Sequence, residues 1–103
     1  MLAIAILTYV VPIEQVLANV DAHRAYLAEL EKRGKLIASG PFVPRTGGAL
    51  LLRPRDEADL AQMIADDPFS IRKIATYDAK IWAPTIGGDS LEDLAVRSTL
   101  PSG

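Results

Sequence analysis

The chain has 103 residues, half of them hydrophobic, and a formal net charge of −2 at pH 7. This length predicts one domain, and a domain this small buries only about two-thirds of its unfolded surface, so association with a second copy would stabilise it. The weak negative charge gives no electrostatic reason to expect a nucleic acid partner. With no cysteine and one histidine, the sequence excludes disulfides, thiolate nucleophiles and a histidine-rich metal cluster within one chain, and we expect no cofactor.

The beginning of the chain is apolar, but it does not have the pattern of a targeting or membrane segment. Residues 1–11 carry no basic leader and no small-residue cleavage site, and they are too few to span a bilayer. No later apolar run is long enough to do so. We therefore expect a soluble, cytoplasmic protein that does not use a membrane as a partner.

The first predicted element is a strand over residues 2–11. Its residues are apolar on both alternating faces, which is typical of a strand that is covered on both sides. Pro12 ends the strand, since proline cannot donate to a sheet. Residues 13–18 are expected to form a separate, short turn of helix.

A longer helix is predicted from about Asp21 to Arg33. Asn19 or Asp21 is the expected N-cap, because both side chains accept hydrogen bonds from free amides at a helix start. Gly34 is expected to stop the helix, since glycine readily takes the left-handed conformation found there.

Two strands joined by a hairpin follow this helix. Residues 35–43 are predicted to form one strand and residues 49–53 the next, with Gly47-Gly48 in the connecting loop. Strict alternation along the first of these strands assigns its residues to two faces. One face carries Leu36, Ala38, Gly40 and Phe42, and the other carries Ile37 and Ser39.

A second helix and a last strand complete the pattern. Asp56 is the expected cap of a helix that must end near Asp66, because the residue before a proline avoids the helical region. A last strand is predicted over roughly residues 74–82, where apolar and polar residues alternate. The tail then holds a short candidate helix over Ser90–Arg97.

The element order β-α-β-β-α-β is typical of the α+β class with a ferredoxin-like protomer, which has an antiparallel sheet with both helices on one face. We assign this domain to residues 1–84 and the tail with its short helix to residues 85–103. The first and third strands are the most apolar, which suits the two central positions of such a sheet. Because two helices cover one face only, we expect a homodimer whose sheets pack face to face.

The candidate for chemistry is a pair of residues 44 positions apart, His23 and Asp67. His23 lies three residues after Val20 and four before Leu27, so it falls on the apolar stripe of its helix, where a polar group is costly unless it is paired. In the first turn of the predicted helix it would also feel the positive helix end. The alternative interpretation of His23 is a helix-surface or half-buried histidine that donates one hydrogen bond. Asp67 precedes Pro68 and is a good structural N-cap, a role that remains open beside a catalytic one.

The remaining site candidates are residues that would contact a substrate. Ser39 lacks the surroundings of a serine nucleophile, so we expect it to donate a hydrogen bond at most. Each candidate also has a purely structural interpretation, as a strand-end serine, a turn or core packing. These candidates are Ser39, Gly40, Pro41, Tyr26 and Phe69.

Several of these residues together resemble the YCII-related (YciI-like) family of the dimeric α+β barrel superfamily. The resemblance covers roughly residues 2–84, and the motifs that carry it are His23-x-x-Tyr26-Leu27-x-x-Leu30, Ser39-Gly40-Pro41, Gly47-Gly48, Asp67-Pro68-Phe69 and Ile81-Trp82. It implies a dimeric α+β barrel and an active site built on His23 and Asp67, sometimes with Ser39. One branch of the family is similar to enzymes that remove hydrogen chloride from chloroaromatic compounds.

The leading hypothesis is a small enzyme without a cofactor, in which His23 moves a proton on a small, anionic or cyclic organic molecule. Isomerisation, elimination and dehydrochlorination all fit, with Asp67 as the residue that orients His23. The alternative is a binding or interaction module that performs no chemistry. Basic side chains that could attract an anionic substrate, or that are equally well explained as solvated surface charges, are Arg45, Arg53, Arg55, Arg72 and Lys73.

Overall fold

The structure is a computed structural model that describes residues 1–99, with side chains described for residues 1–94. Its helices and strands follow the predicted order, and a short helix that begins at Pro68, as expected from Asp67 as its N-cap, lies before the last strand. The elements are β1 (Leu2–Tyr9), α1 (Ile13–Lys32), β2 (Leu36–Pro41), β3 (Gly47–Leu52), α2 (Glu57–Ala65), α3 (Pro68–Ile71), β4 (Ala75–Trp82) and α4 (Gly88–Thr99).

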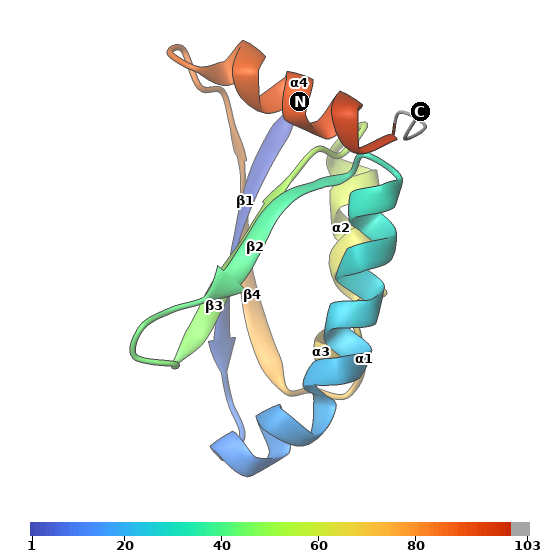
Figure 1. Ribbon diagram of the computed structural model, residues 1–103. Helices are drawn as coiled ribbons and strands as arrows, with labels where there is room; N and C mark the ends of the chain where they lie inside the picture. The colour runs from blue at the N-terminus through green and yellow to red at the C-terminus, as the bar shows by residue number, and fades with distance from the viewer. Residues whose placement is uncertain (100–103) are drawn as a thin grey trace.

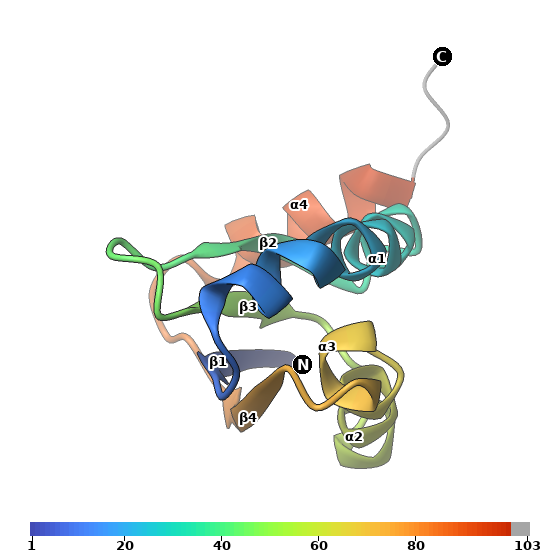
Figure 2. The same ribbon diagram turned by 90° about the horizontal axis from the view of Figure 1, so that it is seen from below.

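The four strands form one antiparallel sheet in the order β2-β3-β1-β4. The two most apolar strands, β1 and β3, are therefore central, as predicted. Helices α1, α2 and α3 lie on one face of the sheet, while α4 crosses one end of the molecule (Figures 1 and 2). This arrangement confirms the α+β class and the ferredoxin-like protomer. Within the described residues, no helix combines the length and apolar character needed to cross a membrane.

The core lies between the sheet and helices α1 and α2. Along β1, Ala3, Ala5 and Leu7 are buried on the helix side, whereas Ile4 and Ile6 on the other side are only partly buried. This period of two follows from the pleat of a strand, which turns successive side chains to opposite faces. One face of β1 therefore packs within the protein, and the other face is left for a further cover.

Helix α1 begins earlier than the sequence predicts. It runs without a break from Ile13, after Pro12 as N-cap and with no side-chain cap, so the separate turn over residues 13–18 and the caps at Asn19 or Asp21 are wrong. Nothing interrupts it, since neither glycine nor proline occurs between Ile13 and Lys32. His23 consequently lies in the middle of the helix, where the field of the helix end has faded. Gly34, with φ of 71°, follows the end as predicted.

Strand β2 departs from strict alternation at Ile37. Leu36 pairs with Leu52, but Ala38 pairs with Leu51 and Ser39 with Leu50, so Ile37 is an extra residue in a β-bulge. Directly paired residues share a face, and Ser39 therefore joins Leu36 on the helix side. The predicted grouping of Ser39 with Ile37 and of Leu36 with Ala38 is wrong for this reason.

The caps of the later helices follow the sequence closely. The Asp56 side chain accepts a hydrogen bond from the Asp59 amide at the start of α2, and the helix ends at Ala65. Helix α4 is longer than the expected Ser90–Arg97. Its Glu92 carboxylate pairs with the amino group of Met1 at 3.2 Å and with Arg53, which ties α4 to the ends of β1 and β3.

Candidate active site

The structure brings His23 and Asp67 into direct contact. The His23 Nδ1 atom lies 2.7 Å from Asp67 Oδ1, and the two side chains are 13% and 1% exposed. A carboxylate can only accept, so Nδ1 carries the hydrogen and the neutral ring keeps a free lone pair on Nε2. Within the described part of the chain, Nε2 has no hydrogen-bond partner.

Asp67 reaches this position because it starts helix α3. Its Oδ1 atom accepts a hydrogen bond of 3.0 Å from the Phe69 amide, and Pro68 occupies the first helical position. The carboxylate is therefore held by the local backbone before it meets His23. The same oxygen atom, Oδ1, therefore caps helix α3 and contacts His23.

Phe69 lies beneath the His23 ring and fixes its plane. The two ring centroids are 3.9 Å apart and the rings are parallel, while Tyr9 meets Phe69 edge-on at 6.1 Å. Phe69 is only 1% exposed. It lines the cavity from inside the core and also supports the imidazole, so its expected contact with a substrate stays a prediction.

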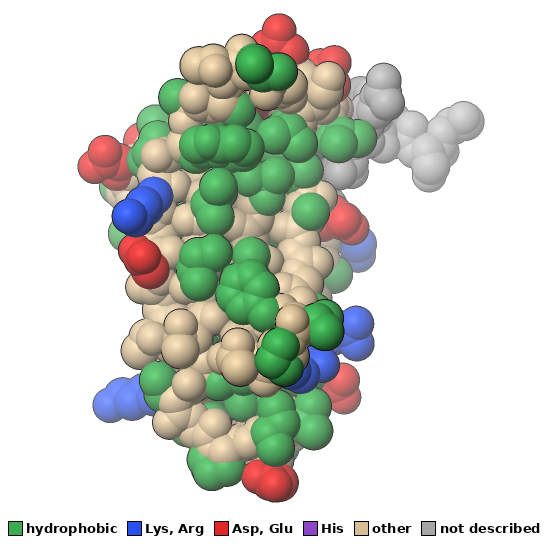
Figure 3. Space-filling view, turned by 90° about the vertical axis from the view of Figure 1, so that its left-hand side faces the viewer, with side chains coloured by type: hydrophobic (Ala, Val, Ile, Leu, Met, Phe, Trp, Pro, Cys, Tyr) green, Lys and Arg blue, Asp and Glu red, His purple; other side chains and the backbone are tan. Residues whose placement is uncertain are grey.

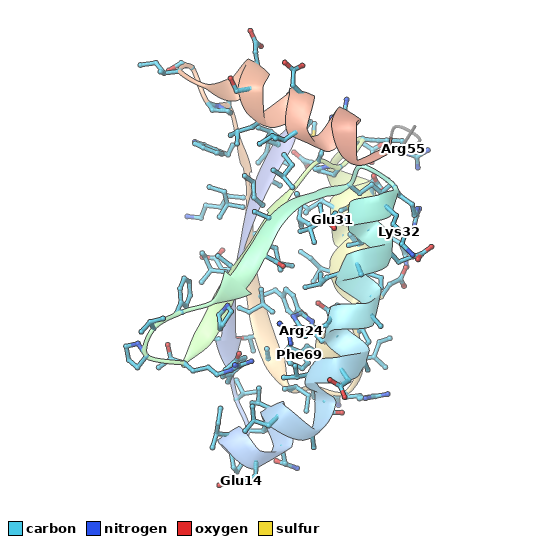
Figure 4. All side chains as sticks on the ribbon, in the orientation of Figure 1. Glu14, Arg24, Glu31, Lys32, Arg55 and Phe69 are labelled. Carbon is cyan, nitrogen blue, oxygen red and sulfur yellow. The ribbon has the colours of Figure 1, made fainter. Side chains whose placement is uncertain are left out.

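A cavity of about 380 Å³ opens beside His23, between α1 and the sheet. Ser39, Gly40 and Pro41 form its wall on β2, because the bulge turns Ser39 toward the helices. Arg24, which Figure 4 shows near Phe69 on the sheet side of α1, also lines it. The complete lining is Leu7, Tyr9, Leu17, Val20, Asp21, His23, Arg24, Leu27, Ser39, Gly40, Pro41, Arg45, Gly48, Ala49, Leu50 and Phe69.

Tyr26 does not line this cavity. Its hydroxyl donates a hydrogen bond of 2.6 Å to the Met63 carbonyl oxygen. Burial, together with the negative charges of Asp66 and Asp67, raises the pKa of Tyr26 to about 12. The side chain thus stays neutral and joins α1 to α2, and the expectation that it contacts a substrate has no geometric support.

Two residues near the site were not singled out from the sequence. Arg24 lies one residue after His23 and lines the cavity, and the continuous helical period of α1 was the signal that could have found it. Tyr77 of β4 lies behind Asp67: burial, and then interaction with the Asp67 carboxylate, raises the pKa of Tyr77. Only the topology brings β4 against α3, so no sequence spacing marks Tyr77.

Fold and geometry define the class: a ferredoxin-like α+β protein with a His–Asp pair beside a cavity of ligand size. A family model, the YCII-related domain, matches residues 2–82, and the chain belongs to that family. A comparison with curated proteins found no match.

Among solved structures, the chain is similar to TftG, the 5-chloro-2-hydroxyhydroquinone dehydrochlorinase of Burkholderia phenoliruptrix AC1100 in complex with 2,5-dihydroxybenzoquinone. The TM-score is 0.70 and the sequence identity 22%, and the match covers 81% of this chain and 94% of the other. At this identity the likeness establishes the shared fold.

Proposed function

We propose that this protein is a small enzyme in which His23 transfers a proton on a small organic molecule bound in the cavity. The observation that carries the proposal is the 2.7 Å contact between His23 Nδ1 and Asp67 Oδ1, which leaves Nε2 free on a ring that lines the cavity. A positioned imidazole with a free nitrogen is the group most often used for general acid–base catalysis. Isomerisation, elimination and dehydrochlorination all begin with such a proton transfer.

Asp67 would act through His23. A buried carboxylate on Nδ1 holds the ring in one tautomer and stabilises the imidazolium that forms when Nε2 takes a proton from carbon or oxygen. The Phe69 ring, parallel to the imidazole at 3.9 Å, prevents it from rotating away. One such group typically supplies about 10²–10⁴-fold in rate, and positioning of the substrate must supply the rest.

The cavity favours a small anionic substrate. Arg24 and Arg45 both line it, and neither forms an ion pair with another described residue. Asp21 also lines it and offsets part of their charge. A volume of 380 Å³ lies at the small end of the range for ligand pockets. TftG, which shares the fold, was solved with the small molecule 2,5-dihydroxybenzoquinone.

Ser39 and the backbone at Gly40 would hold the substrate against β2. Both residues line the cavity, and the Ser39 hydroxyl forms no hydrogen bond with another described residue. A hydroxyl that can either donate or accept suits a carbonyl, enol or carboxylate group. Ser39 therefore supplies orientation in this proposal and no covalent step.

The experiment is a binding and turnover screen with chlorinated hydroxyhydroquinones, chlorolactones, muconolactones and short keto acids. For a compound that is turned over, His23→Ala should lower kcat by about 10²–10⁴-fold. His23→Ala with activity equal to wild type would remove the catalytic assignment. Compounds that bind with an affinity independent of pH and are never consumed would instead identify a binding module.

We also propose that two copies associate through the open face of the sheet. This face carries Ile4, Ile6 and Leu51, which are only partly buried, and Trp82, which is 39% exposed. Hydrophobic side chains gather over this side of the molecule in Figure 3. A second sheet is a cover of the right shape, because a contact about a two-fold axis matches an apolar face with itself.

Light scattering tests this association. Leu51→Lys, on the open face with the apolar Ile4 and Ala38 as its cross-strand neighbours, should convert a dimer into a monomer at micromolar concentration, since a buried lysine without a partner is costly. Ile71→Lys is the matched control, because Ile71 is 65% exposed on α3, on the helix side of the sheet. A wild-type protein that is monomeric at this concentration would overturn the proposal.

A further inference from the structure

The Asp67 carboxylate uses only one of its two oxygen atoms. Oδ1 accepts from both His23 Nδ1, at 2.7 Å, and the Phe69 amide, at 3.0 Å. Oδ2 is fully buried and has no hydrogen-bond partner among the described residues. A buried carboxylate oxygen without a donor is costly, and such atoms in native proteins require an explanation.

The Tyr77 hydroxyl is the complementary atom. It is the other buried side-chain polar atom without a hydrogen-bond partner in the described part of the chain. Tyr77 sits on the helix side of β4, opposite Leu7 of β1, and this side faces α3. Burial, and then interaction with Asp67, raises the pKa of Tyr77, so the phenol keeps its hydrogen. An unused donor therefore stands beside an unused acceptor.

We infer that Tyr77 is a positioning residue whose hydroxyl donates a hydrogen bond to Asp67 Oδ2. This bond completes a chain from Tyr77 through Asp67 to His23, in which each carboxylate oxygen has a donor. Only the catalytic consequence rests on the proposed function; the hydrogen bond itself does not. Tyr77 touches no substrate in this arrangement, because it does not line the cavity.

The expected effect of this hydrogen bond is on the protonation of the pair His23–Asp67. A donor on Oδ2 stabilises the carboxylate, so Asp67 depends less on a positive imidazole to offset its burial. Removing the donor should make the pair hold a proton more tightly.

Other titratable groups that face the pair do not supply this donor. Tyr26 of α1 commits its hydroxyl to the Met63 carbonyl oxygen. Asp66, at the end of α2, accepts from the Gln62 amide at the surface. Arg24 and Arg45 stand on the cavity side, beyond the imidazole. Tyr77 is thus the group placed to complete the carboxylate.

The test is an NMR titration of the His23 ring in the full-length protein, without substrate. In Tyr77→Phe the midpoint of the titration should move to higher pH, because the carboxylate has lost its second donor. Tyr26→Phe is the matched control and should leave the midpoint at the wild-type value, since its hydroxyl bonds to a backbone carbonyl oxygen. Equal midpoints in wild type and Tyr77→Phe would overturn the inference, because phenylalanine fills the same space.

A crystal structure of the wild-type protein gives a test that needs no variant. A Tyr77 hydroxyl within about 3.0 Å of Asp67 Oδ2 would support the bond, and a separation beyond about 3.5 Å would refute it. The two proposals can fail separately. A titration that responds to Tyr77→Phe with no compound turned over refutes the enzyme alone, whereas His23-dependent turnover with an unchanged titration refutes the role of Tyr77 alone.

Discussion

The interface between α1 and the sheet has a packed half and a hollow half. The packed half is filled by buried side chains, and the hollow half is the cavity beside His23. The same two strands, β2 and β3, border both halves. They present Leu36 and Leu52 to the packed half, together with Leu30 of α1, and Ser39 and Gly48 to the hollow half. The comparison shows that small side chains on β2 and β3 make the cavity. The helix itself continues unbroken along both halves.

Gly48 lets the backbones of β2 and β3 lie close together and adds no side chain to the cavity. A Cβ atom at Gly48 would lie 2.6 Å from the Gly40 carbonyl oxygen, which is closer than real contacts allow. The two strands therefore approach closely only because Gly48 has no side chain. We expect the free energy of folding to come mainly from the packed half, where buried side chains fill the space.

The largest expected difference between the halves is in stability. Leu52→Ala should lower the free energy of unfolding by about 2–5 kcal/mol, because Leu52 is 1% exposed and a void would remain. Leu17→Ala, in the lining of the hollow half and 55% exposed, should change it by less than about 0.5 kcal/mol. Urea denaturation measures both. Equal losses would refute the division into halves.

Phe69 lies where the two halves meet, and Phe69→Leu should separate support of the imidazole from filling of the core. Leucine retains most of the buried volume, so the loss of unfolding free energy should be about 1.5 kcal/mol. The parallel ring beneath His23 disappears, and activity on any substrate found should fall while the folded fraction stays near one. Unfolding curves and initial rates measured on the same samples would show this, and an unchanged kcat would contradict the supporting role.

Tyr26 packs against the core and joins α1 to α2 outside the cavity, and Tyr26→Phe should show it. Removing the hydroxyl leaves the Met63 carbonyl oxygen without its donor and should cost about 1 kcal/mol of stability. Ligand affinity should not change, because Tyr26 does not line the cavity. Calorimetric titration with any ligand found checks this, and a weaker affinity would restore Tyr26 to the binding site.

The last expected effect depends on pH and concerns an ion pair outside both halves. The hydrogen bond from Lys35, and then that from the Arg55 amide, lowers the pKa of Asp59. Because the folded pKa is below the unfolded value of about 4, the stabilisation is present above that pH and lost as the pH falls through the folded value. Lys35→Met should cost about 1 kcal/mol near neutral pH and progressively less in acid.

Unfolding of the Lys35→Met variant over a series of pH values measures this loss. Arg55→Met is the control, because Arg55 is 81% exposed and its Nε atom lies 3.9 Å from Asp59 Oδ2. An exposed pair of this kind contributes little. A stability difference between wild type and Lys35→Met that persists unchanged into strong acid would contradict the pairing.

The sequence predicts those parts of the fold that depend on local chemistry. Alternation and apolar content place β1 and β3 at the centre, and Asp56 and Gly34 mark helix ends through caps that need only a few neighbours. The start of α1 was missed because Asn19 and Asp21 look like caps, although nothing before them stops a helix. A capping residue only favours a helix start at its position, and an apolar stripe that continues on both sides of it favours one unbroken helix.

The site is predictable only in part, for a related reason. His23 stands out in the sequence because a polar side chain on an apolar stripe needs a partner. Asp67 stands out because an N-cap residue before a proline has a fixed backbone position. Tyr77 and the inward direction of Ser39 are results of tertiary structure. The first depends on β4 packing against α3, and the second on an extra residue opposite β3.

That extra residue, Ile37, has no paired residue in β3, so β2 is one residue longer than the pairing requires. A shortened chain without Ile37 would still place Leu36 opposite Leu52 and Ser39 opposite Leu50, since the pairing already passes over it. We therefore expect loss or retention of this residue to leave the cavity unchanged, although it shifts every later residue number by one. Aligning such chains by an uninterrupted strand would assign the cavity-facing position of Ser39 to a neighbour on the wrong side of the sheet.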